Sequence, residues 1–153
     1  MALDPRLMEL RGLLDSDDPD AQQRALETLV ELLDLAAESR RTGIPAVLAD
    51  EQARALVRSS IVAFIDREPT RPAAATAIFA LGKLYDASLE PYLADLAALF
   101  LDDDGLTWHL RQTVVALDNL GALDTLRLER FPNEPAAMRK AATDYLDARG
   151  QPA

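Results

Sequence analysis

The chain has 153 residues, the length of one domain, and 49% of them are hydrophobic, enough to bury a core. Its 16 Lys and Arg residues against 26 Asp and Glu residues give a formal net charge of −10, which argues against binding to nucleic acid or to an anionic membrane. With no cysteine and one histidine, the chain cannot form a disulfide, a thiolate nucleophile or a two-histidine metal site. The charged start and the absence of a long apolar run predict a cytoplasmic protein.

The residue usage predicts an all-α fold. Ala and Leu are abundant, Val and Ile are few, and apolar residues recur at three- and four-residue steps. Asp-Pro pairs that start helices, and Gly or Pro residues that stop them, divide the chain into helical stretches. The expected helices cover about residues 5–14, 19–39, 51–65, 72–85, 88–102, 107–121, 124–132 and 134–148.

Individual residues are expected to set the helix ends. We expect Ser88 to cap the fifth helix and Thr107 the sixth, because hydroxyl side chains accept hydrogen bonds from the first free N–H groups. Gly43 is expected to stop the second helix and Gly150 the last. Connections of a few residues imply that successive helices pack antiparallel.

The predicted helix at 72–85 is apolar around most of its circumference. Only a narrow stripe that contains Thr76 and Lys83 is left for water. A helix of this kind has to be covered on several sides, so we expect it in the core.

Three segments of the chain match without gaps. Residues 25–32, 77–84 and 113–120 share the pattern small, apolar, two variable, Leu, two variable, Leu. Their starts lie 52 and 36 residues apart, a spacing typical of a two-helix repeat in an α-solenoid. The predicted organisation is a single helical-repeat domain over 1–153, with units at about 19–66, 70–102 and 106–131 and a terminal helix at 134–148.

These segments resemble a known family. The run Ala-Leu-Gly-Lys-Leu at 80–84, followed by Asp86, resembles the inner helix of HEAT-like repeats, and the stretch from Asp17 to Ala25 resembles the opening of such a repeat. Residues 77–121 are more narrowly similar to small bacterial immunity proteins of HEAT-like architecture, which neutralise a cognate toxin. The resemblance implies a short HEAT-like α-solenoid; the chain departs from its pattern at 43–50 and at the short seventh helix.

Acidic loops invite a metal interpretation that the spacing does not support. A calcium loop that began at Asp15 or at Asp102 would need Gly at its sixth and Glu at its twelfth position, and neither loop has them. Both loops precede helices, where carboxylates cap and stabilise the first turn. His109 has no second histidine and no serine placed by sequence to form a triad with it. We therefore expect no catalytic residue, no metal and no cofactor.

The negative charge is concentrated in one region. Residues 86–129 hold nine acidic residues and two arginines, a balance of −7. Some polar and aromatic residues there have two interpretations: Trp108 fills the core or binds a partner, His109 contacts a partner or lies in a surface or capping position, and Asp118 and Asn119 form a solvated face or a contact. The candidate partner-binding residues are Asp86, Glu90, Tyr92, Asp102, Asp103, Asp104, Trp108, His109, Asp118 and Asn119.

These observations favour a non-catalytic protein-binding module whose acidic face binds a basic protein. Through the resemblance, that partner is a toxin domain and the chain is an immunity protein, a monomer or a weak homodimer. A scaffold or assembly subunit with HEAT-like repeats is the alternative. An enzyme on a HEAT-like scaffold, such as a DNA glycosylase or a bilin lyase, is less favoured, since a glycosylase needs a basic groove.

Overall fold

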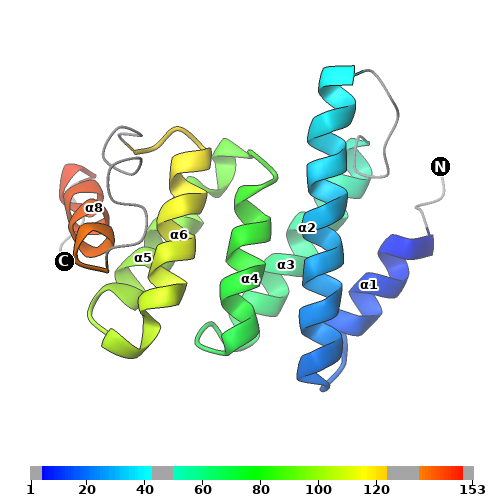
Figure 1. Cartoon of the computed structure of the whole chain (residues 1–153), viewed down its shortest axis with the longest axis horizontal. Coiled ribbons are helices and arrows are strands. Elements are labelled where there is room, and N and C mark those ends of the chain that lie inside the picture. The colour runs from blue at the N-terminus through cyan, green and yellow to red at the C-terminus, as the bar shows by residue number, and fades with distance from the viewer. Residues whose placement is uncertain (1–4, 43–49, 124–134, 150–153) are drawn as a thin grey trace. The chain divides into compact units, whose positions relative to one another are not determined.

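The computed structural model describes residues 5–42, 50–123 and 135–149, and these form helices and the turns between them, without strands (Figure 1). The predicted all-α fold is confirmed. The α-helices and the 3-10 turns η2 and η3 are α1 (Pro5–Asp15), α2 (Pro19–Thr42), α3 (Glu51–Arg67), α4 (Pro72–Gly82), η2 (Ala87–Leu89), α5 (Glu90–Leu101), η3 (Asp104–Leu106), α6 (Thr107–Asn119) and α8 (Pro135–Ala148). The stops expected at Gly43 and Gly150, and the predicted helix at 124–132, lie outside the described residues.

Two predicted caps are wrong, because a 3-10 turn precedes α5 and another precedes α6. Asp86, not Ser88, starts the first of these turns: its Oδ1 accepts hydrogen bonds from Ser88 N at 3.0 Å and from Ser88 Oγ at 2.6 Å. Thr107 is the first residue of α6, and its hydroxyl donates to the carbonyl of Asp104 at 2.9 Å. An aspartate therefore begins each of the two 3-10 turns, Asp86 in η2 and Asp103 in η3, and takes the capping role that was expected of Ser88 and Thr107.

The chain divides into two compact units, Met1–Leu84 and Tyr85–Ala153. In the first unit, α2 and α3 each pack against α1 and α4. In the second unit, α5 and α6 pack as a hairpin and α8 packs against both of them (Figure 1). The single domain and the repeat boundaries expected from the sequence stay a prediction.

Burial of α4 agrees with its predicted place in the core. Eight of its 11 residues are buried; Pro72 at its start is exposed, and Thr76, Phe79 and the following Lys83 reach solvent in part. The polar members of this stripe bind α2: the Gln23 amide donates to the Thr76 hydroxyl at 3.1 Å, and Lys83 Nζ lies 2.8 Å from Asp34 Oδ1. The helix ends at Gly82, three residues earlier than predicted, where the following N–H groups turn to 3-10 hydrogen bonds.

The first two matching segments lie on α2 and α4, which are in direct contact within the first unit. The third lies on α6 of the second unit. Among residues 5–42, 50–123 and 135–149, no helix has the combination of length and apolar character that crossing a bilayer requires.

Candidate binding surface

All ten candidate residues fall in the second unit, and its helical hairpin divides them between two ends. α5 has 12 residues and α6 has 13, so the ends of the hairpin lie about 18 Å apart. Asp102–Asp104 and Trp108 lie at the loop end, where α5 turns into α6. Asp86, Glu90, Asp118 and Asn119 lie at the opposite end. The structure therefore does not gather the ten residues into one patch.

The three aspartates of the loop end are all exposed. Asp103 accepts a hydrogen bond from Gly105 N at 2.9 Å and so begins the 3-10 turn. Asp104, whose side chain is 92% exposed, pairs with Arg139 of α8. Asp102 is the C-terminal cap residue of α5. We call Asp102, Asp103, Asp104 and Trp108 the loop-end surface.

Trp108 lies on the exposed side of α6. Its side chain is 56% exposed, and the guanidinium carbon of Arg111 lies 5.0 Å from the centroid of its ring. The interpretation of Trp108 as a core residue is therefore wrong. A large aromatic side chain that stays in water is uncommon away from binding surfaces, where tryptophan is enriched.

His109 has the opposite environment. It is 7% exposed, and its ring lies 5.4 Å from that of Phe100, tilted by 57°. The expected surface position is wrong, and His109 is not available to a partner. The sequence held a signal for this, because His109 is in phase with Leu106, Thr113 and Ala116, which are all buried.

At the opposite end of the hairpin, the candidate residues make contacts within the protein or are partly buried. Asp86 caps the 3-10 turn before α5. Glu90 accepts a hydrogen bond from the Tyr145 hydroxyl of α8 at 3.0 Å. Tyr92, Asp118 and Asn119 are each partly buried. The role of this end as a contact for a partner stays a prediction.

Glu90, Tyr145 and Arg149 form a polar cluster that joins α8 to α5. Arg149 Nη1 lies 3.2 Å from the Tyr145 hydroxyl oxygen and 3.8 Å from Glu90 Oε1. Burial, together with the hydrogen bond and the negative charge of Glu90, raises the pKa of Tyr145 to about 12, while Arg149 acts in the opposite direction. The cluster gives Glu90 a role within the fold.

No group of three or more His, Asp or Glu side chains in the described part of the chain is placed to hold a metal ion. The acidic loop before α2 serves as a helix cap, as expected: Asp18 Oδ1 accepts a hydrogen bond from Asp20 N at 3.0 Å.

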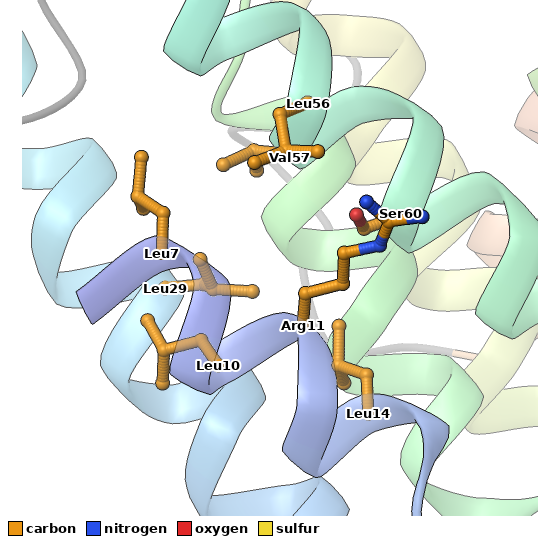
Figure 2. A pocket seen from close by; sticks show the side chains of 8 residues that line it. All are labelled: Leu7, Leu10, Arg11, Leu14, Leu29, Leu56, Val57 and Ser60. Carbon is orange, nitrogen blue, oxygen red and sulfur yellow. The ribbon is translucent and has the colours of Figure 1, made fainter. Parts of the chain in front are cut away.

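One pocket of the first unit lies among α1, α2 and α3 (Figure 2). Its volume of about 10 Å³ holds a single water molecule at most. Arg11 and Ser60 supply its polar groups, and the rest of its wall is apolar: Leu7, Leu10, Leu14, Leu29, Leu56 and Val57. The pocket is too small for a substrate or a cofactor.

A second, open hollow of about 600 Å³ lies where α2 and α4 begin. The guanidinium carbon of Arg71 in its wall lies 4.5 Å from the centroid of the Phe64 ring, and Arg71 Nε donates to the carbonyl of Glu68 at 3.3 Å. Gln22 donates to the carbonyl of Ser16 at 2.6 Å. Arg71 and Gln22 thus stabilise the turns before α4 and α2. The wall of the hollow also contains carboxylates, whose negative charge is opposite to that of Arg71.

Among the candidate residues that the structure describes, the loop-end surface combines an exposed aromatic ring with three exposed carboxylates. Sequence reasoning missed Arg111, Arg139 and Tyr145, whose contacts with candidate residues are made across turns of a helix or between helices. An Arg three residues after a Trp on one helix was the one local signal for such a contact.

Comparison of the chain with protein-family models, with curated proteins and with solved structures found no match.

Proposed function

We propose that the chain is a non-catalytic protein-binding module that binds a basic protein through the loop-end surface. The observation that supports this most directly is the exposed indole of Trp108 next to the aspartate loop. Binding surfaces commonly combine an aromatic anchor with charged residues around it.

The charges of this region favour a cationic partner. From Asp86 to Leu110 the chain carries six acidic residues and no Lys or Arg. Concentrated charge of one sign accelerates the encounter with a partner of opposite sign, and salt weakens the effect. Asp102 and Asp103 make no ion pair within the described chain, so their charges act on the solvent side.

An immunity protein is the specific form of this function that we favour. Neutralising a toxin requires only that its active surface be covered tightly and for a long time, without any chemistry by the inhibitor. A basic toxin domain suits the acidic loop, and the exposed Trp108 ring suits an apolar pocket on it.

The test begins with a photo-reactive amino acid in place of Trp108 in living cells, with the same residue in place of Asp147 of α8 as a control. We expect a basic protein to cross-link from position 108 and not from position 147. That protein is then purified and its association with the unmodified chain is measured at several salt concentrations.

The charge contribution is tested with Asp102→Asn combined with Asp103→Asn. Asparagine retains the oxygen that caps the 3-10 turn, so the variant removes charge and keeps the fold. The matched control, Asp95→Asn with Asp147→Asn, removes two exposed charges elsewhere in the same unit. We expect the association rate at low salt to fall about threefold to tenfold in the first variant only. Equal rates in the two variants, or an acidic protein as the cross-linked partner, would contradict the proposal.

A further inference from the structure

Tyr85 has an unusual backbone conformation for an aromatic residue. Its φ is 52°, and it is the one non-glycine residue of the described chain with a positive φ. L-residues with bulky side chains avoid this left-handed region because their Cβ approaches the backbone too closely. The side chain of Tyr85 is 47% exposed, so burial compensates for the strain only in part.

The corresponding position of another matching segment holds glycine. Because residues 77–84 match residues 113–120, Tyr85 corresponds to Gly121. Gly121 has a φ of 77°, in the same left-handed region. A Cβ added to Gly121 would meet no atom within 4 Å. The left-handed backbone, and not a lack of space, therefore explains why glycine suits this position. At the corresponding position, Tyr85 adopts the same backbone conformation with strain that glycine would not have.

We propose that Tyr85 is a second contact residue for the basic partner, and that its ring receives a guanidinium or ammonium group of that partner. Strained residues that a fold retains are concentrated at functional sites. An aromatic ring attracts cations to its face, and Asp86, which follows directly, adds negative charge. This inference rests on the proposed function, because it assumes the same cationic partner.

The position of Tyr85 gives the partner a second point of attachment. Tyr85 lies just before α5, at the end of the hairpin opposite the loop-end surface. The two ends are about 18 Å apart, a span that one partner protein covers in an interface of ordinary size. The partner would then contact Tyr85 and Trp108 together.

The test uses an oligoarginine peptide as the probe, in low salt, with the full chain and its variants. Tyr85→Gly removes the ring and the backbone strain at once. We expect its Tm to rise by about 2–4 °C while its dissociation constant for the peptide rises about threefold to tenfold. Tyr85→Phe keeps the ring and should bind as the unmodified chain does.

Two variants serve as controls. Met8→Ala removes a side chain of nearly the same exposure, 48%, from the first unit and should leave peptide binding unchanged. Trp108→Ala tests the proposed function separately. If Trp108→Ala binds the peptide more weakly and Tyr85→Gly binds it normally, the inference on Tyr85 is overturned and the proposed function is not. Weaker binding in Tyr85→Gly alone supports the inference and overturns the role of Trp108. Normal binding in both variants overturns both.

Discussion

α4 and α6 carry matching segments, yet they expose very different surfaces. α4 is buried along most of its length: after the exposed Pro72 at its start, only Thr76, Phe79 and the following Lys83 reach water, each in part. α6 keeps Trp108 largely in water and leaves Arg111 partly exposed beside it. The shared pattern of small residues and leucines fixes which side of each helix packs, while the variable positions decide whether the other side is covered.

The corresponding positions show how this difference arises. Where α4 begins with Pro72, α6 has Trp108, and where α4 has Lys83, α6 has Asn119. Lys83 is held by the carboxylate of Asp34 within its own unit. Pro72 and Trp108 are both exposed, but only Trp108 brings a large aromatic side chain into solvent. Helices that share one pattern can thus differ in the side chains that they present to solvent.

The largest effect is expected for Leu81→Asp in α4. Leu81 is fully buried, and an unpaired carboxylate there costs several kcal/mol, on the order of the whole stability of a domain of this size. We expect the cooperative thermal transition, followed by circular dichroism, to be lost. Thr76→Asp places the same charge on the half-exposed stripe of the same helix and should keep the transition. A normal melt for Leu81→Asp would show that α4 is not a core helix.

A smaller effect is expected for Gly121→Ala at the end of α6. The added methyl group meets open space, so the loss comes from the left-handed backbone alone, about 1–2 kcal/mol. Chemical denaturation measures it. Equal stability of Gly121→Ala and the unmodified chain would remove the physical basis for comparing Gly121 with Tyr85.

Tyr145→Phe should destabilise the second unit by about 1 kcal/mol, because it removes the hydrogen bond to Glu90. It should also change the response to alkaline pH. The hydroxyl of Tyr145 ionises near pH 10 when unfolded and near pH 12 when folded, so the folded state holds a proton that the unfolded state has lost. The free energy of unfolding of the unmodified chain should fall between these pH values.

Denaturation at a series of pH values checks this. The Phe variant lacks the ionisable hydroxyl, so its stability should fall less steeply over the same range. Parallel pH curves for the two proteins would show that folding does not raise the pKa of Tyr145.

The smallest effect on stability is expected for Trp108→Ala. Because its side chain is mostly in water, its removal should change the free energy of unfolding by no more than about 0.5 kcal/mol. The thermal midpoint should stay within about 2 °C of the unmodified value. A large loss of stability would mean that Trp108 packs against the fold, and would remove the contrast between α4 and α6.

The sequence predicted the helical class, most helix boundaries and the burial of α4, because these follow from local preferences and from the spacing of apolar residues. It did not predict which of two adjacent residues, Trp108 or His109, faces the core. Neighbours on a helix point about 100° apart, and the hydrophobicity of Trp was given more weight than the phase set by Leu106 and Thr113. The cap at Asp86 was missed because a 3-10 turn, which Asp86 begins, precedes α5.

Contacts between helices were beyond the reach of sequence reasoning. The pairing of Asp104 with Arg139 and of Glu90 with Tyr145 joins residues that lie far apart in the chain. Nothing local to either residue specifies such a partner. Glu90 was therefore predicted as a partner contact, although in the fold it accepts a hydrogen bond from Tyr145 of α8.

The exposed indole on α6 also has a practical consequence. Trp108 is the single tryptophan of the chain, so the protein carries one built-in fluorophore, and it lies on the proposed docking surface. Because the ring is largely exposed, we expect its emission in the native state to be that of an indole in water. A partner that covers the ring would shift that emission to shorter wavelengths, which allows complex formation to be followed in real time without any label.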